Sequence, residues 1–289
     1  MHDLIVVGGG PVGASLVRAA RGLSVALVAH AHRQPMARAA FDARVYALSP
    51  GNVAFLQSLG VWQAMPQDRL VPVHAMRIYG DEPGARLEFD AYAAGVPALA
   101  WIVEDAVLQD ALWQGLEAQL FAPAACQALD VSADRVLLRL DDGREVAGKL
   151  IVGADGAQSF VRAQALIAAD EGDYGQSAVV ANFRCEEPHR NVAYQWFQHG
   201  AVLALLPLPG AHVSMVWSLP AEEAGRVAGL DGESLCREVS AAARGEVGDL
   251  TLVTPPRSYA LRRLTARRLV APRVALAGDA GHVIHPLAG

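Results

Sequence analysis

Short apolar runs that lead into glycine-rich turns form the most regular pattern in the sequence. Residues 4–7 are Leu-Ile-Val-Val, residues 24–29 are Ser-Val-Ala-Leu-Val-Ala, and Arg-Val-Ala-Leu-Ala occupies 273–277. Continuous apolar runs of this length are typical of strands buried on both faces of a parallel sheet. We therefore expect a sheet of mostly parallel strands that carries helices on its faces.

Helical spacing and capping residues predict several helices between these strands. Ser49 is a good N-cap, Pro50 suits the first helical position, and Gly60 suits the end of the helix between them. Apolar residues three and four positions apart predict a long helix over 104–120 and a shorter one over 234–244.

An antiparallel pattern appears in the middle of the chain. Short apolar segments predict strands at 178–184, 193–197, 202–206 and 213–217. Two further strand pairs are predicted around the turns at 80–84 and 141–143. Trp196, Phe197 and Trp217 admit two interpretations, the wall of an apolar ligand cavity or ordinary core packing.

Composition excludes several classes of protein. The chain has 289 residues, a formal net charge of -6 and a pI near 5.8, so a nucleic-acid partner is not expected. Cys126, Cys185 and Cys236 are too widely spaced for a metal cluster and suit a reducing compartment. No apolar run approaches the roughly 20 residues of a membrane span. We expect a cytoplasmic protein without a metal ion, and peripheral contact with the inner membrane stays open.

The first glycine-rich turn has the spacing of a dinucleotide-binding fingerprint. Gly8, Gly10 and Gly13 follow a buried strand and open a helix over 11–21. Gly8 permits a tight turn, Gly10 lets the backbone approach a pyrophosphate, and Gly13 lets the helix lie close to the strand. The unpaired N–H groups and partial positive charge of the helix N-terminus favour a phosphate.

The acidic residue that usually accompanies this fingerprint is missing. A carboxylate about 20 residues past the first glycine would bind the adenosine ribose, but Ala29 occupies that region. His30 or His32 is able to donate to a ribose hydroxyl, and a solvated loop histidine is the alternative. Arg44, ahead of the helix that starts at Pro50, is likewise either a phosphate ligand or an ordinary surface arginine.

Four stretches together resemble one family. They are Gly8 to Gly13, Asp42 to Ser49, Gly153 to Arg162 and Arg273 to Gly289. In this order they are similar to the single-component FAD-dependent aromatic hydroxylases, which have the para-hydroxybenzoate hydroxylase fold. The Asp42-Ala43-Arg44 sequence with Ala47-Leu48-Ser49 points within this group to the hydroxylases of ubiquinone biosynthesis.

The resemblance implies an α/β fold in which a Rossmann-like FAD-binding domain of the GR2 type is interleaved with a mostly antiparallel β-sheet substrate lobe. The FAD-binding domain would comprise 1–75, 100–176 and 255–289. The substrate lobe would comprise 76–99 and 177–254. Relatives continue beyond the position of Gly289 with a mainly helical segment, so we expect a C-terminally truncated chain whose activity is in doubt.

The resemblance also assigns residues to the cofactor. Asp155 would organise the pyrophosphate region and the transient contact with NAD(P)H, and Asp279 would accept hydrogen bonds from the ribitol chain. No catalytic residue is assigned. The residues implied to hold FAD are Gly8, Gly10, Pro11, Val12, Gly13, Arg44, Asp155, Gly156, Gly278, Asp279, Pro286 and Gly289.

The implied activity is aromatic monooxygenation. NAD(P)H would reduce the flavin, and a flavin C4a-hydroperoxide would deliver oxygen to the ring of a polyprenylated phenol or quinol in ubiquinone biosynthesis. The partners would be that substrate and, as open possibilities, the membrane surface or a biosynthetic complex. Two alternatives stay open: a hydroxylase of a small soluble aromatic compound, and a flavin-free scaffold of a biosynthetic complex.

Overall fold

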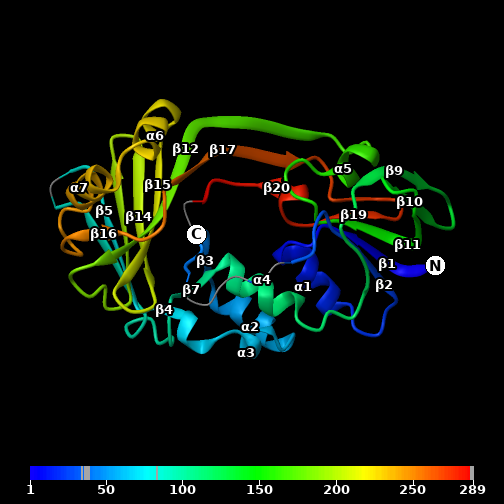
Figure 1. Ribbon diagram of the computed structural model, residues 1–289, viewed down its shortest axis with the longest axis horizontal. Coiled ribbons are helices and arrows are strands. Elements are labelled where there is room, and N and C mark those ends of the chain that lie inside the picture. Colours follow the sequence, from blue (N-terminus) through cyan, green and yellow to red (C-terminus); the bar gives the residue numbers. More distant parts are fainter. Residues whose placement is uncertain (34, 36–39, 83, 287–289) are drawn as a thin grey trace. The chain divides into compact units, whose positions relative to one another are not determined.

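The computed structural model describes residues 1–33, 35, 40–82 and 84–286. The chain divides into two compact units, each built from separate parts of the sequence (Figure 1). Unit 1 comprises 1–35, 108–172 and 262–285, and unit 2 comprises 36–107, 173–261 and 286–289. The helix α4 (Asp105–Trp113) and the long strands β12 (Ala169–Cys185) and β17 (Arg257–Ala266) each contain residues of both units.

Unit 1 contains the predicted parallel sheet. Its strand order is β18-β19-β11-β1-β2-β8, and the strands from β19 to β8 in this order run parallel to one another. The strands are β1 (His2–Val7), β2 (Val25–Val28), β8 (Gln119–Phe121), β11 (Glu145–Gly153), β18 (Val270–Ala271) and β19 (Val274–Leu276). The apolar runs at the start of the chain are buried as expected, since Leu4 to Val7 and Val25 to Val28 are all at most 6% exposed.

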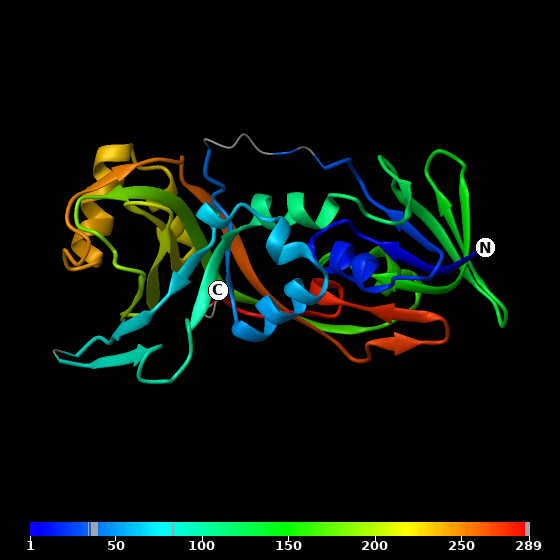
Figure 2. The same cartoon turned by 90° about the horizontal axis from the view of Figure 1, so that it is seen from below.

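A hairpin and three helices complete most of unit 1. The hairpin β9 (Cys126–Val131) and β10 (Val136–Leu140) pairs with β11, and Figure 2 shows it in green near the N-terminus. The helices are α1 (Pro11–Ala19), α5 (Phe160–Gln164) and the last residues of α4. The short strand β20 (His282–Val283) pairs with the end of β17.

The long helix predicted over 104–120 is wrong in its second half. The helix α4 ends at Trp113, because Gly115 adopts a left-handed backbone conformation with φ +68°. Leu120 then lies in β8 and is 39% exposed. The apolar spacing that predicted the helix continues past Gly115 only by coincidence. Leu120, which fits that spacing, belongs to a strand.

Unit 2 is organised around an antiparallel sheet, whose order is β17-β12-β15-β14-β13-β5-β6. The pairs from β12 to β13 and the pair of β5 with β6 are antiparallel, whereas β13 and β5 are parallel. The helices α6 (Ala221–Ala228) and α7 (Gly232–Ala242) lie on one side of this sheet (Figure 1) and bury its apolar face. The other strands of this sheet are β5 (Ala75–Tyr79), β6 (Arg86–Asp90), β13 (Val192–Gln198), β14 (Ala201–Leu208) and β15 (His212–Pro220), with β16 (Leu250–Leu252) beside β12.

The predicted aromatic residues of this sheet belong mainly to its core. Trp196 is fully buried and stacks on Tyr79 and Tyr194, with ring centroids 5.7 Å and 5.6 Å away. Trp217 packs in the same cluster, whereas Phe197 is 39% exposed. Ordinary core packing is therefore the correct interpretation for the two tryptophans.

A second, three-stranded sheet in unit 2 carries a group of short helices. It consists of β3 (Val45–Leu48), β7 (Ala100–Glu104) and β4 (Val71–Val73). The helices are α2 (Pro50–Ser58), α3 (Val61–Ala64) and the 3-10 turn η1 (Gln67–Arg69). The predicted cap of α2 is confirmed, since Ser49 Oγ accepts a hydrogen bond from Asn52 N at 3.3 Å.

Candidate functional site

Three of the predicted glycine motifs lie at one edge of the unit 1 sheet. The strands β1, β11 and β19 are parallel neighbours, and the register places Val7 beside Gly153 and Gly153 beside Leu276. Hydrogen bonds continue past these strand ends, from Ala154 N to Val7 O at 2.8 Å and from Ala277 N to Gly153 O at 2.9 Å. The turns that follow the three strands therefore meet, at the carboxyl edge where open α/β sheets bind their ligands.

The glycines of the first turn have two different functions in the structure. A Cβ on Gly8, whose φ is +109°, would lie 2.1 Å from Ala154 O, and a Cβ on Gly13 would lie 1.9 Å from Gly8 O. These two glycines allow close packing of the backbone. A Cβ on Gly10 would meet nothing within 4 Å. Gly10 is thus not required by the fold, and the open space beside it is suited to a ligand.

The N-terminus of α1 is suited to binding an anion. Gly10 is the N-cap without a side-chain hydrogen bond, Pro11 is the first helical residue, and no acidic residue lies in the first turn. The first N–H groups of a helix have no partner within the helix and carry a partial positive charge. A pyrophosphate fits this position because its oxygens accept these hydrogen bonds and carry the opposite charge.

Asp155 offers an unused acceptor beside this turn. Its Oδ2 accepts a hydrogen bond from Val161 N at 3.1 Å, at the start of α5. Its Oδ1 is buried and has no hydrogen-bond partner among the residues that the structure describes. A buried carboxylate oxygen without a donor is costly, and a hydroxyl-bearing ligand would supply one. Gly156 follows with φ +81°, which turns the chain away from the strand.

The third motif packs directly against the first. A Cβ on Gly278, whose φ is +60°, would lie 2.9 Å from Cγ2 of Val12. Asp279 is exposed in the short 3-10 turn η2 (Gly278–Ala280), so its carboxylate is available to a ligand. With the open space at Gly10 and the free oxygen of Asp155, these residues fit an FAD molecule, which has both phosphates and a polyol chain.

Two residues that the sequence did not single out as ligands hold this site together. Trp113 at the end of α4 donates from Nε1 to Gly9 O at 2.8 Å and covers Gly9. Arg162 is 8% exposed and donates to Ala280 O at 2.9 Å and to Ala157 O at 2.7 Å. Arg162 therefore ties the second glycine turn to the third. Its place at the end of the family-like stretch 153–162 was a usable signal, whereas nothing in the sequence pointed from Trp113 to Gly9.

Ala29, at the position expected for a ribose-binding acid, is buried, and its backbone is hydrogen-bonded to neighbouring segments. Ala29 is 6% exposed, its N–H donates to Phe121 O, and its carbonyl accepts from Ala124 N, both at 3.0 Å. His30 and His32 are exposed. Arg33, close after them, pairs with Asp110 of α4 at 2.8 Å.

Arg44 lies in unit 2 and is held by an ion pair. Its guanidinium bonds to Asp105, which is only 2% exposed and also accepts a hydrogen bond from the Tyr46 hydroxyl at 2.9 Å. The side chain of Arg44 is 55% exposed, so it retains N–H groups that face solvent. The negative charge of Asp105 helps to raise the pKa of Arg44 against the effect of burial.

The segment before Arg44 is anchored by a buried carboxylate. Glu104 is fully buried and binds Arg69 through both oxygens, at 2.6–2.8 Å. It also accepts from Asp42 N at 2.7 Å, and Asn182 donates to Asp42 O at 2.8 Å. Burial raises the pKa of the Glu104 carboxyl, and the hydrogen bonds from Asp42 and Arg69 oppose that change.

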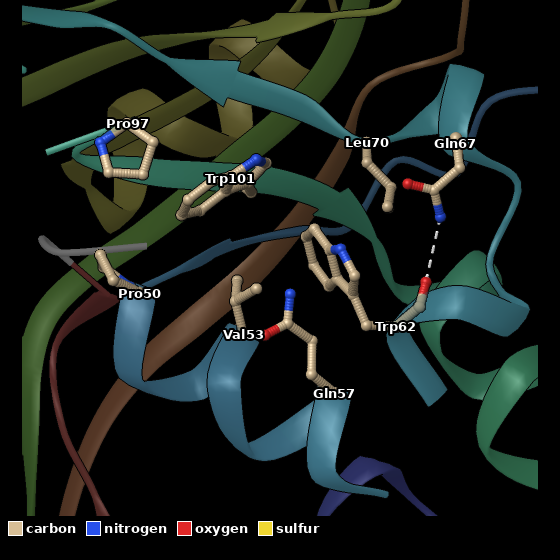
Figure 3. Close-up of a pocket in the computed structure, with 8 residues that line it drawn as sticks. All are labelled: Pro50, Val53, Gln57, Trp62, Gln67, Leu70, Pro97 and Trp101. Atoms are coloured by element: carbon tan, nitrogen blue, oxygen red, sulfur yellow. Dashed lines mark hydrogen bonds between the residues drawn. The ribbon is translucent and has the colours of Figure 1, made fainter. Parts of the chain in front are cut away.

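A separate pocket of about 380 Å³ lies within unit 2, between α2, α3 and the strand β7 (Figure 3). Trp62 and Trp101 meet edge to face in its wall, with centroids 5.9 Å apart. Gln67 lies at its side and uses its amide to donate to Trp62 O at 3.1 Å. The lining residues are Pro50, Val53, Gln57, Trp62, Gln67, Leu70, Pro97 and Trp101. None of the aromatic residues predicted as a cavity wall lines this pocket.

The last two residues assigned to FAD lie at the end of the chain. Pro286 is exposed, and Gly289 lies outside the described residues. Burial lowers the pKa of His285, which favours its neutral form. Among the residues that the structure describes, no cluster of His, Cys, Asp or Glu is suited to a metal ion.

The parallel sheet with its three glycine turns and the antiparallel sheet of unit 2 give this chain the fold of FAD-dependent monooxygenases of known structure. Residues 1–289 match the FAD binding domain family, and the chain belongs to that family. It is an FAD-dependent monooxygenase.

Similar proteins include two named hydroxylases. The 3-demethoxyubiquinol 3-hydroxylase of Escherichia coli is 35% identical over 99% of this chain and 75% of its own length. The ubiquinone hydroxylase UbiL of Rhodospirillum rubrum is 32% identical over 99% of this chain and 68% of its own. The crystal structure of PqsL from Pseudomonas aeruginosa has the same fold, with a TM-score of 0.81 at 24% identity over 99% of this chain and 80% of PqsL.

Proposed function

We propose that the chain hydroxylates the aromatic ring of a polyprenylated phenol or quinol intermediate of ubiquinone biosynthesis, with FAD as cofactor and with NAD(P)H and O₂ as co-substrates. The observation that carries this proposal is the identity of 35% and 32% with two ubiquinone-pathway hydroxylases over nearly the whole chain. The prenylated substrate is the part of the proposal that rests on these relatives.

The residues of unit 1 have a definite role in this proposal. Bound FAD supplies the hydride acceptor and the oxygen activation. The N–H groups at the start of α1 bind its pyrophosphate beside Gly10. Asp155 accepts a hydrogen bond through Oδ1, and the exposed carboxylate of Asp279 accepts from the ribitol hydroxyls. Arg44 of unit 2 is assigned to an FAD phosphate on the sequence resemblance alone; Asp105, which Tyr46 holds by a hydrogen bond, orients its guanidinium.

The pocket of unit 2 offers the substrate an apolar side as well as the polar side chains of Gln57 and Gln67. Trp62, Trp101, Val53 and Leu70 present aromatic and aliphatic atoms, and binding pockets for small molecules are usually lined in this way. We assign this pocket to the apolar isoprenoid portion of the substrate. The proposed division keeps 1–75, 100–176 and 255–289 in the FAD-binding domain, so seven of the eight residues that line this pocket come from that domain and Pro97 comes from the substrate lobe.

The proposed site of action is the cytoplasmic surface of the inner membrane. No helix among the described residues is long and apolar enough to cross a membrane. A polyprenyl chain partitions into lipid, so an enzyme that acts on its head group works most easily from the membrane surface.

The proposal is tested with the purified chain loaded with FAD. It is supplied with NADH or NADPH and isotopically labelled O₂, together with a phenol that bears a short isoprenoid tail. Incorporation of one labelled oxygen atom into the ring, detected by mass spectrometry, is the expected result. A matched phenol without the tail should react at least tenfold more slowly, because it lacks the contacts of the unit 2 pocket.

Two results would overturn the proposal. Labelled oxygen only in the phenol without a tail would favour a hydroxylase of small soluble aromatics. Failure of the chain to bind FAD would instead favour a flavin-free scaffold. The variant Trp101→Ala separates the substrate from the cofactor, since it should raise KM for the prenylated phenol and leave FAD binding unchanged.

A further inference from the structure

The last part of unit 1 has a charge distribution unlike that of the rest of the chain. Six arginines and no Asp or Glu lie between 250 and 278, in a protein whose net charge is -6. Five of these arginines belong to unit 1. Arg273 uses its guanidinium on the carbonyls of Ala133 and Lys149. Arg268 is exposed and makes no hydrogen bond or ion pair that the structure describes.

Large apolar side chains are exposed beside these arginines. Leu269 is 48% exposed and Val270 is 65% exposed. They lie at and beside β18, the edge strand of the unit 1 sheet. Leu166 is 85% exposed, and its φ of 52° turns it outward after α5. The hydrogen bond from Arg267 N to Ala168 O, 2.9 Å long, brings the Leu166 segment next to the arginines.

We name this surface the β18 edge and define it by Leu166, Arg267, Arg268, Leu269 and Val270. The fold does not bury the charge of Arg267. Its side chain and that of its partner Asp170 are 69% and 65% exposed. Such exposed pairs contribute little to stability. An exposed apolar cluster bordered by basic residues is typical of a surface that binds another protein or a membrane.

We propose that the β18 edge docks on the headgroup region of an anionic phospholipid membrane. The arginines have the charge that anionic headgroups attract, and their long side chains reach the phosphates. The leucines and valine insert at the boundary between headgroups and acyl chains. The proposal rests on the proposed function in one respect, since a lipid-dissolved substrate gives the enzyme a reason to dock.

Co-sedimentation with vesicles tests this proposal on the FAD-loaded chain. Vesicles of phosphatidylcholine with phosphatidylglycerol should bind the chain, vesicles of phosphatidylcholine alone should bind it at least tenfold less, and salt should weaken the binding. The double variant Arg267→Gln, Arg268→Gln should lower binding about tenfold or more. The double variant Leu269→Ser, Val270→Ser should also lower it about tenfold, in both low and high salt.

Matched controls show whether the position of the residues decides the result. Arg184→Gln with Arg237→Gln removes two exposed charges of unit 2, and Tyr92→Ser and Leu23→Ser remove side chains that are 95% and 52% exposed. These controls should bind anionic vesicles as the unmodified chain does. Thermal unfolding of every variant confirms that its fold is intact.

Three outcomes would refute membrane docking at the β18 edge. They are equal binding to neutral and anionic vesicles, an equal loss in the control variants, and a change of oligomeric state in Leu269→Ser, Val270→Ser without any change in vesicle binding. The last would mean that a second copy of the chain covers this surface. Turnover of detergent-dispersed substrate should be unchanged in the β18-edge variants, so a failure of the proposed hydroxylation is seen separately.

Discussion

Replacing Gly10 by alanine distinguishes a ligand-binding glycine from a folding glycine. The added Cβ would meet no protein atom within 4 Å, and the backbone of Gly10 is extended, with φ -70° and ψ -179°. Alanine adopts this conformation without strain. The folded chain without cofactor should therefore lose at most about 1 kcal/mol of unfolding free energy, the amount by which alanine is a poorer N-cap than glycine.

The same substitution should markedly weaken FAD binding. The methyl group would occupy the space in which the pyrophosphate meets the N–H groups of α1. A hydrogen bond to a charged group contributes about 1.5–3 kcal/mol, so its loss corresponds to about a tenfold to hundredfold increase in Kd. Titration of the chain with FAD, followed by flavin fluorescence, measures Kd, and urea unfolding measures stability.

Gly13→Ala is the matched comparison. Its Cβ would lie 1.9 Å from Gly8 O, a backbone atom that cannot move without displacing β1 or α1. Overpacking of this kind costs about 1–3 kcal/mol or more, so Gly13→Ala should destabilise the chain even without FAD. If Gly10→Ala bound FAD as tightly as the unmodified chain, the pyrophosphate would not lie at Gly10 and the assignment of this turn would fail.

Three other positions give measurable expectations. Asp279→Ala should raise the Kd for FAD and change the unfolding free energy by less than about 0.5 kcal/mol, because the side chain is exposed; unchanged flavin affinity would count against its role. Glu104→Gln should cost about 3–5 kcal/mol in urea unfolding, because it leaves Arg69 without its buried carboxylate. Adding Arg69→Met should recover part of that loss, and a loss below about 1 kcal/mol in the single variant would contradict the buried pair. Burial, with Asp155 and Asp141, raises the pKa of Cys126 to about 12, so its thiol should resist alkylation at neutral pH until the chain is unfolded. Between pH 9.0 and about 12 the thiol loses its proton in the unfolded chain and keeps it in the folded chain, so the free energy of unfolding should fall as the pH rises through this range. Urea unfolding at several pH values should show this fall in the unmodified chain and a smaller one in Cys126→Ala.

Local signals predicted many of the individual elements. The apolar run of β1, the cap of α2 at Ser49 and the hairpin of β10 with β11 depend on neighbours in the sequence, so pattern and propensity were sufficient. The end of α4 was missed because Gly115 stops the helix while the apolar spacing continues. The wall of the pocket was missed because Trp62 and Trp101 come from different elements, and their approach depends on how β7 and α3 pack.

The sequence by itself determined the residue types at the proposed cofactor site, because a tight turn after a buried strand selects glycine and a polyol ligand would select an acceptor such as aspartate. Only the tertiary structure decided how these residues are used. The parallel pairing of β1, β11 and β19 brings three turns from distant parts of the chain to one edge of the sheet. Backbone atoms pack closely against Gly8 and Gly13, whereas the space beside Gly10 is open. The same holds for Arg44, whose partner Asp105 lies far along the chain and is buried. Contacts between distant segments depend on the packing of the whole sheet, which no local pattern encodes.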